Sequence, residues 1–285
     1  MSLLSIVWDI SPTLFQLGPF EIRWYGLLFA LAFLFGFSII TRMFKLENVP
    51  DEWADKLLIY MMLAVVLGAR FGHVFFYDWA YYSQNPSEIL KVWHGGLASH
   101  GGAIGIVIAL ILFSKFVSKR SPLWVFDRIM VVVALGAFLI RLGNFMNSEI
   151  FGFQTDVAWG VEFVRAKAYY PLVARHPTQL YEAFSYFLVF LALVYIYEKT
   201  EYKNKQGFMF GIFLIFAFAA RFLIEFLKEN QEAFEDGMVL NMGQILSIPF
   251  FLAGFYFVFR NQSTKEIETT AKKEAILSSN VKPKN

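Results

Sequence analysis

Long apolar runs, interrupted by short polar segments, dominate the pattern along this chain of 285 residues. A helix that crosses a bilayer needs about 20 mostly apolar residues, and seven stretches meet or approach that length. They are Ile22–Thr41, Leu57–Tyr77, Gly101–Val117, Leu123–Ile140, Gln179–Tyr197, Gly207–Leu227 and Val239–Phe259. The pattern therefore predicts an all-α integral membrane protein with about seven transmembrane helices.

The polar segments between these stretches carry uneven shares of Lys and Arg. Cytoplasmic loops of membrane proteins carry an excess of both residues. If the N-terminus lies outside, most of the 25 Lys and Arg residues fall in segments that face the cytoplasm. This distribution predicts an outside N-terminus, a cytoplasmic C-terminus and an odd number of spans.

Two of the outward segments are long. We expect residues 78–100 to form a surface arm and residues 142–178 to form a small extracytoplasmic cap, in which Val157–Val164 could be a short strand or hairpin. Residues 1–260 then form a single polytopic membrane domain. The polar residues 261–285 are predicted to be a solvated cytoplasmic tail.

Composition agrees with this class and narrows the chemistry. Only 17% of the residues are charged and the mean hydropathy is +0.51, whereas soluble domains carry about 25% charged residues. A net charge of +2 without a clustered basic face argues against nucleic-acid binding. The chain has no Cys, so a cysteine nucleophile is excluded and any reacting thiol belongs to a substrate. We expect no cofactor and no metal site.

His100 is the first candidate for chemistry. It lies in the run HGGLASHGGAIG, which begins at His94 and opens the third predicted helix. Glycines let a backbone approach a ligand closely, and helix N-termini favour anions. The alternative is a glycine-rich loop with a structural histidine.

Arg141 is the second candidate, at the predicted end of the fourth helix. Asn144 and Asn147 follow at steps of three, and Glu149 comes next. A guanidinium binds phosphate through two parallel hydrogen bonds, so an Arg with nearby amides suits a phosphate group. The alternative is an arginine that extends its charged end to the membrane surface.

Arg221 and Glu225 form the third candidate, because residues at i and i+4 share one face of a helix. Fourteen residues at 1.5 Å each place Arg221 roughly 21 Å above Gly207, in the outer half of the bilayer. The alternative is a buried structural ion pair. Arg70, in the second helix, is interpreted as structural. With His100 and Arg141, the predicted topology gathers polar groups on the outer side, which favours a lipid head group as substrate.

Seven motifs in order resemble those of the bacterial prolipoprotein diacylglyceryl transferases, over roughly residues 15–260. The matching runs are IRWYGLLFA, GARFGHVFFYDW, HGGLASHGGAIG, RLGNFMNSEIFG, RHPTQLYEA, RFLIEFLKENQ and LNMGQILSIPF. The segment from Arg141 to Gly152 is the most specific of them.

The resemblance implies a reaction and its residues. The family transfers the diacylglyceryl group of phosphatidylglycerol to the lipobox cysteine of signal-peptide-bearing preprolipoproteins and releases glycerol phosphate. This is the first step of bacterial lipoprotein maturation, at the periplasmic side of the inner membrane. By motif, catalysis falls to His100, Arg141 and Arg221, and substrate binding to Tyr25, Arg141, Asn144, Glu149, Gly152 and Glu225.

Two positions depart from the family pattern. Lys228 stands where the family often has Arg, which keeps the charge and loses the bidentate fork. Ala217, one turn before Arg221, stands where some members have Tyr, so a phenol at that position has no role in this chain.

We interpret His100 as the base that deprotonates the thiol, and the two arginines as ligands of the phosphate. Alternatively, the arginines alone lower the thiol pKa and His100 only positions the substrate. Two other functions remain open at this stage: a transporter of a lipid or small anionic solute, and a structural subunit of a membrane complex. A transporter would show polar residues at the midplane and paired broken helices. A structural subunit would show small-residue stripes without clustered Arg.

Overall fold

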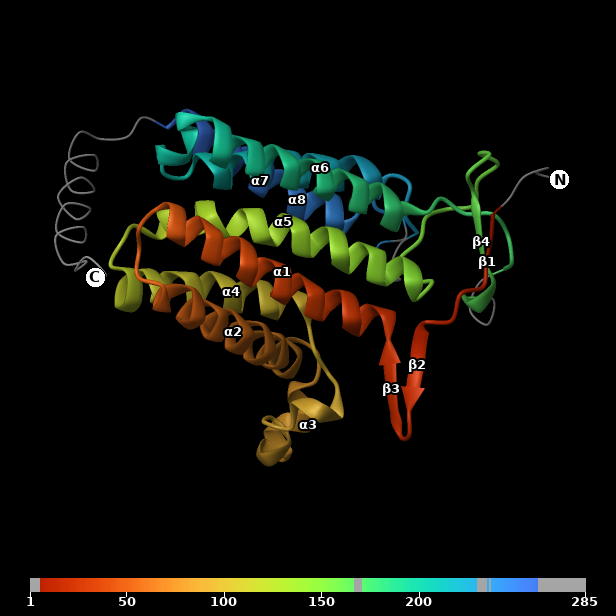
Figure 1. Cartoon of the computed structure of the whole chain (residues 1–285). Helices are drawn as coiled ribbons and strands as arrows, with labels where there is room; N and C mark the ends of the chain where they lie inside the picture. The colour runs from red at the N-terminus through yellow and green to blue at the C-terminus, as the bar shows by residue number, and fades with distance from the viewer. Residues whose placement is uncertain (1–5, 167–170, 230–234, 236, 261–285) are drawn as a thin grey trace. The chain divides into compact units, whose positions relative to one another are not determined.

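The computed structural model confirms the predicted class, and it describes residues 6–166, 171–229, 235 and 237–260 (Figure 1). The predicted tail 261–285 lies outside the described residues. Within them, seven helices are long and apolar enough to cross a membrane. They are α1 (Trp24–Leu46), α2 (Glu52–Phe76), α4 (Ser99–Phe113, extended by a π-helical turn Ser114–Ser118), α5 (Pro122–Met146), α6 (Thr178–Lys199), α7 (Phe208–Glu225) and α8 (Met242–Phe259).

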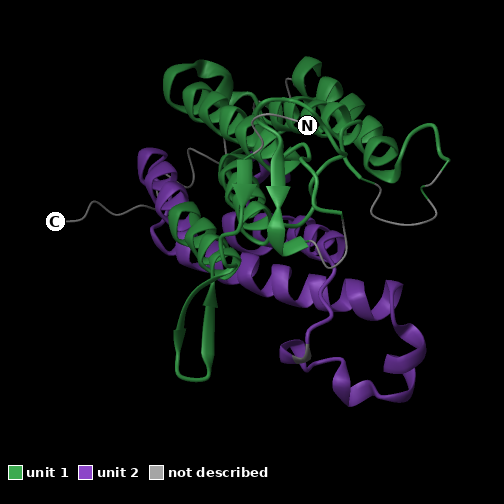
Figure 2. Cartoon of the chain, turned by 90° about the vertical axis from the view of Figure 1, so that its right-hand side faces the viewer, with its two compact units in different colours: residues 1–36, 127–261 green, residues 37–126, 262–285 purple. Residues whose placement is uncertain are grey.

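The chain forms two compact units (Figure 2). Of the described residues, the first contains the N-terminal part up to Gly36 together with Asp127–Arg260. The second contains Phe37–Phe126. Helix α1 therefore begins in the first unit and ends in the second, and α5 begins in the second and ends in the first.

In the first unit, α7 and α8 pack closely through glycine. A Cβ on Gly211 would lie 2.8 Å from the carbonyl oxygen of Gly254, so a larger residue would push the helices apart. Small residues allow such close packing of helices at interfaces within membranes. The start of α7 is held from another helix: the buried Asp127 of α5 accepts hydrogen bonds from the backbone N–H groups of Gly207 (2.7 Å) and Phe210 (2.9 Å).

Four short strands also belong to the first unit, and the apolar-run pattern did not predict the three at the N-terminus. Strand β1 (Ile6–Trp8) pairs in parallel with β4 (Val161–Phe163), and β2 (Thr13–Leu17) pairs with β3 (Phe20–Arg23) as a hairpin. A strand does form within Val157–Val164, but its partner is β1, so the hairpin alternative is wrong. The Trp8 ring packs 4.3 Å from the Phe145 ring, which fixes this pair of strands on the end of α5.

In the second unit, the buried Arg70 of α2 holds the segment that leads to α4. Its guanidinium donates to the carbonyl oxygens of Glu88 (2.6 Å), Ile89 (2.8 Å) and Gly95 (2.5 Å). The segment includes α3 (Trp79–Gln84) and 3-10 turns at Pro86–Glu88 and Val92–His94. The structural interpretation of Arg70 is confirmed, because backbone carbonyls occupy its donors.

Candidate functional site

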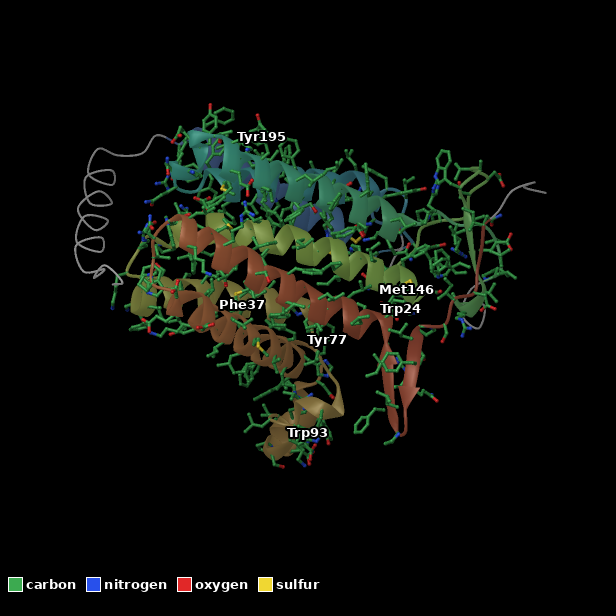
Figure 3. The ribbon with its side chains drawn as sticks, viewed as in Figure 1. Trp24, Phe37, Tyr77, Trp93, Met146 and Tyr195 are labelled. Carbon is green, nitrogen blue, oxygen red and sulfur yellow. The ribbon has the colours of Figure 1, made fainter. Side chains whose placement is uncertain are left out.

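Buried polar side chains gather at one end of the first unit. Since α5, α6, α7 and α8 alternate in direction, this end contains the last turns of α5 and α7 and the first turns of α6 and α8. Figure 3 marks it by Met146, where α5 ends, and by Trp24, where α1 begins. The polar cluster, as we call it, consists of Arg141, Asn144, Glu149, Glu182, Tyr186, Arg221, Glu225 and Lys228.

Arg141 is fixed on two sides. Its Nε lies 2.7 Å from Oε2 of Glu182, whose side chain is completely buried. Its Nη1 donates to Oδ1 of Asn144 at 3.1 Å. This contact exists because α5 runs on to Met146, beyond the predicted end at Ile140, and keeps residues at i and i+3 on one face. Arg141 is thus a largely buried arginine that is paired within the protein.

Asn144 connects Arg141 to Glu149 in one hydrogen-bond network. Its Nδ2 donates to Oε1 of Glu149 at 2.8 Å, and Nδ2 of Asn147 donates to the same oxygen at 3.2 Å. The backbone carbonyl of Glu149 accepts a hydrogen bond from Nε2 of the buried Gln179 at 2.6 Å. The predicted group of Arg141, the two asparagines and Glu149 is therefore one connected site.

Lys228 joins two carboxylates. Its Nζ lies 3.3 Å from Oε1 of Glu182 and 3.2 Å from Oε2 of Glu225. A Cβ on Gly243 would lie 2.6 Å from Cδ of Glu225, so glycine at the start of α8 leaves room for this carboxylate. Lysine can bridge both partners with its three donors, although it lacks the planar fork of arginine. Glu225 therefore has Lys228 as an ion-pair partner.

Arg221 differs from the other two cations of the polar cluster. Its Nε is buried and has no hydrogen-bond partner among the described residues. The phenol of the buried Tyr186 has both Arg141 and Arg221 as charged neighbours, which places Arg221 beside the rest of the polar cluster. Three basic and three acidic side chains cancel in formal charge, so the polar cluster carries no net charge into the interior.

Tyr25 and Gly152 lie at the margin of the polar cluster. Glu149 and Arg141 are the charged neighbours of the Tyr25 phenol. Gly152 serves close packing: a Cβ there would lie 2.8 Å from Thr178 Cγ2 and 2.9 Å from His176 Cβ. Burial lowers the pKa of His176 below its usual value. A Cβ on Gly152 would also collide with the carbonyl oxygen of Leu227, so glycine at this position lets three chain segments pack closely next to the polar cluster.

His100 belongs to the second unit. It lies in the first turn of α4, is exposed, and has the rings of Phe76 and Tyr77 at 5.6 and 5.5 Å. An exposed imidazole at a helix start is accessible to a substrate. No group of metal-ligating side chains occurs among the described residues.

Three members of the polar cluster, Glu182, Tyr186 and Lys228, were not among the predicted site residues, although Lys228 was noted as a departure from the family pattern. Glu182 had a sequence signal, since an ionisable residue within an apolar span is a functional candidate by default. Tyr186 had none, because α6 contains other tyrosines of ordinary membrane-belt type. Its place beside two arginines became visible only in the structure.

Comparisons with known proteins agree with one another. The family described as prolipoprotein diacylglyceryl transferase matches residues 12–260. Two relatives, each called phosphatidylglycerol–prolipoprotein diacylglyceryl transferase, are 46% identical: that of Chloroherpeton thalassium covers 93% of this chain and 98% of its own length, and that of Tolumonas auensis covers 91% and 99%. A protein of the same name from Bacteroides fragilis is 41% identical over 93% of this chain and 99% of its own.

Proposed function

The chain belongs to the prolipoprotein diacylglyceryl transferase family, and on that premise we propose that its polar cluster binds the phosphate of phosphatidylglycerol while the diacylglyceryl group passes to a prolipoprotein thiol. The chain is a multi-pass membrane transferase. Family membership favours this function over the transporter and the structural subunit. The phosphate site within it is our proposal.

The observation that carries the proposal is the buried Nε of Arg221, which has no hydrogen-bond partner in the part of the chain that the structure describes. A buried polar group without a hydrogen bond is costly, so an arginine in this state is suited to an anionic ligand. Phosphate fits best, because its oxygens match the donor fork of a guanidinium. Arg141 already has Glu182 and Asn144 as partners, so we assign the main phosphate contact to Arg221 and a supporting contact to Arg141.

In the proposed reaction, a carbon–sulfur bond forms as the carbon–oxygen bond to phosphate breaks. The thiol proton leaves to a base, and glycerol phosphate departs with the negative charge of the broken bond. The arginines stabilise this developing charge, and a fixed cation does so without reorganising. Glu182 and Lys228 would keep Arg141 in place during this step.

The base is proposed to be His100. Its exposed position in the first turn of α4 suits a proton exchange with substrate and solvent, and histidine is the commonest general base in enzymes. The thiol has a reference pKa near 8.5, so a base would increase the thiolate fraction at neutral pH. Arg141 and Arg221 would not need to ionise the thiol themselves.

Tyr186 is proposed to supply the phenol that is missing at Ala217. Ala217 is buried on α7 one turn before Arg221, and a methyl group there offers no hydrogen bond. The Tyr186 phenol of α6 has both arginines as neighbours and can orient them from the opposite helix. The phenol would then come from α6 in this chain instead of from the position of Ala217 on α7, and its proposed role beside the arginines would be retained.

We propose the side of the membrane that the polar cluster faces from the distribution of Lys and Arg along the chain. Lys and Arg gather in the segments opposite the polar cluster, including Lys199, Lys203, Lys205 and Arg260. By the positive-inside rule these segments are cytoplasmic, so the polar cluster would face the periplasmic side of the inner membrane. Signal-peptide-bearing prolipoproteins would meet the site there.

The test is transfer of labelled diacylglyceryl from phosphatidylglycerol to a lipobox peptide in proteoliposomes. We expect Arg221→Gln to lower kcat/KM by about 10²–10³-fold, as for loss of a charge-stabilising donor, and Arg221→Lys to lower it less. Arg165→Gln is the control, because Arg165 is partly exposed and pairs with Asp9. Near-normal transfer by a folded Arg221→Gln variant would overturn the assignment of the phosphate contact.

A further inference from the structure

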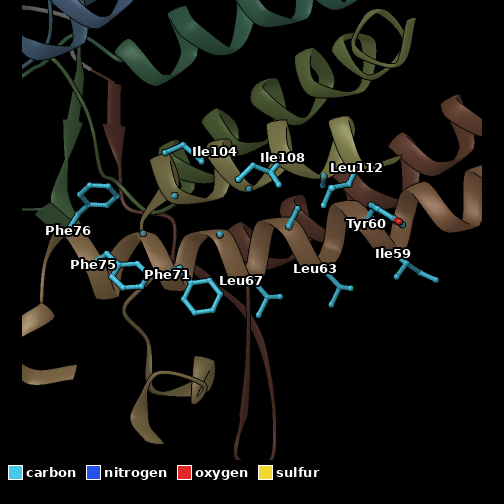
Figure 4. A pocket seen from close by; sticks show the side chains of 16 residues that line it. Ile59, Tyr60, Leu63, Leu67, Phe71, Phe75, Phe76, Ile104, Ile108 and Leu112 are labelled. Atoms are coloured by element: carbon cyan, nitrogen blue, oxygen red, sulfur yellow. The ribbon is translucent and has the colours of Figure 1, made fainter. Parts of the chain in front are cut away.

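An apolar groove runs along the second unit between α2 and α4 (Figure 4). One wall is the row Leu63, Leu67, Phe71 and Phe75 of α2, and the other is the row Ile104, Ile108 and Leu112 of α4. Both rows repeat every four residues, so each is a straight ridge on its helix.

The floor of the groove is made of glycine. A Cβ on Gly72 would lie 2.6 Å from Cα of Gly101, and one on Gly105 would lie 3.1 Å from Cα of Gly68. The two backbones therefore touch where the glycines meet. Because these positions have no side chains, an open channel remains between the two ridges.

The dimensions of the groove indicate what fits inside it. Its volume is about 570 Å³, and it extends from Ile59 to Phe76 of α2, which is about 25 Å at 1.5 Å per residue. An extended hydrocarbon chain of that length, about 4 Å across, occupies roughly 300 Å³ and fits this volume. A helix, at 10–12 Å in diameter, would occupy roughly 2,000–2,800 Å³ over the same length and would not fit.

We propose that this groove binds a single acyl chain of a bilayer phospholipid. Both helices are membrane spans, the only side-chain hydroxyl in the lining is that of Tyr60, and the lining is otherwise apolar. Polar groups occur at the ends: Tyr60 at one, and His100 beside Phe76 at the other. An apolar slot with polar ends matches an amphiphile. This inference does not depend on the proposed function.

The chain provides matched pairs for a test. Leu67 and Val66 are 40% and 43% exposed, and Ile108 and Val107 are 52% and 44% exposed, yet only Leu67 and Ile108 line the groove. General contact with lipid would therefore label both members of a pair. A resident chain would add label at the lining member of each pair and not at the other.

The experiment uses the full chain in phosphatidylethanolamine vesicles that contain a phosphatidylethanolamine with a diazirine at mid-chain. This lipid differs from the substrate, so binding at the polar cluster does not interfere. After irradiation, mass spectrometry locates the adducts. We expect at least fivefold more adduct on Leu67 and Ile108 than on Val66 and Val107. Equal labelling within each pair would overturn the proposal.

A second experiment fills the groove with a larger side chain. Ile108→Trp should lower the labelling of Leu67 at least fivefold, whereas Val107→Trp should leave it unchanged, and gel filtration in detergent confirms that both variants are folded. Labelling of Leu67 that survives in folded Ile108→Trp would contradict the proposal. Because the natural chain has no Cys, Ile108→Cys adds one reporter: rapid oxidative dimerisation would show that a second copy covers the groove, which would also overturn it.

Discussion

Replacing Glu182 with Gln would remove the carboxylate that the polar cluster is built around. Glu182 has no exposed side-chain surface and contacts Arg141 at 2.7 Å and Lys228 at 3.3 Å. Glutamine keeps the shape and removes the charge. Lys228 would retain Glu225 at 3.2 Å. Among the described residues, Arg141 would retain only uncharged partners, the amide of Asn144 and the phenol of Tyr186. The substitution therefore leaves one largely buried positive charge uncompensated.

Removing one partner of a buried ion pair costs about 3–5 kcal/mol. Because Lys228 still has a partner, we expect the lower end of this range, about 3 kcal/mol, for Glu182→Gln. Lys228→Met in the same background restores the balance of formal charge. The double variant should then be more stable than the sum of the two single effects, by roughly 1 kcal/mol or more.

The assay is unfolding of the purified chain in mixed detergent micelles, followed by circular dichroism, for the wild type, both single variants and the double variant. Glu198→Gln is the control, since Glu198 is exposed on the same helix and exposed charges contribute about 0–1 kcal/mol. A cost below about 1 kcal/mol for Glu182→Gln, or simple additivity in the double variant, would refute the buried network.

Three further outcomes follow from the same structure. His100→Gln should lower transfer at pH 7 by about 10²-fold or more and recover as the pH approaches the thiol pKa of roughly 8.5; a loss that is independent of pH would rule out the base. Gly243→Ala should cost about 1–3 kcal/mol and reduce transfer, because its Cβ would lie 2.6 Å from Glu225 Cδ, whereas Gly136→Ala, which meets only Ala32 Cβ at 3.9 Å, should be neutral or stabilising by about 0.5–1 kcal/mol. Burial lowers the pKa of His176, so the folded state binds fewer protons than the unfolded state; stability should fall as the pH drops below about 6.5, and His176→Asn should flatten that dependence in pH-jump unfolding.

The spans were predictable because a bilayer imposes length and apolarity on them. All seven apolar stretches overlap an observed helix, and the largest difference at a C-terminus is at α5, which continues past Ile140 to Met146. The apolar signal ends at Ile140 because Arg141 and Asn144 are polar, yet helical geometry continues. The strands at the N-terminus were missed because three to five residues are too few to show a period, and β1 depends on β4, about 150 residues away in the chain.

The site was predictable where its residues are neighbours in sequence. Arg141, Asn144 and Glu149 form a local pattern, and their hydrogen bonds confirm that they act together. The spacing of residues in the sequence could not predict which side chains from different helices would pair. The predicted relation of Arg221 to Glu225 is an example: both lie on one face, but Glu225 pairs with Lys228 at 3.2 Å, since the helix ends at Glu225 and the chain turns Lys228 back toward it.

The hydrogen bonds from Gly207 and Phe210 to Asp127 have a consequence for biogenesis. Helix α7 starts at a left-handed Gly207 with no capping side chain of its own, and Asp127 lies 80 residues earlier in the chain. The ribosome therefore delivers the acceptor long before the donors. Until α7 emerges, the carboxylate in the second turn of α5 lacks these two hydrogen-bond donors, which opposes deep insertion of that turn. Arrival of α7, the sixth of the seven described spans, removes this obstacle, so the register of α5 and α7 at this end of the bundle is fixed late in synthesis.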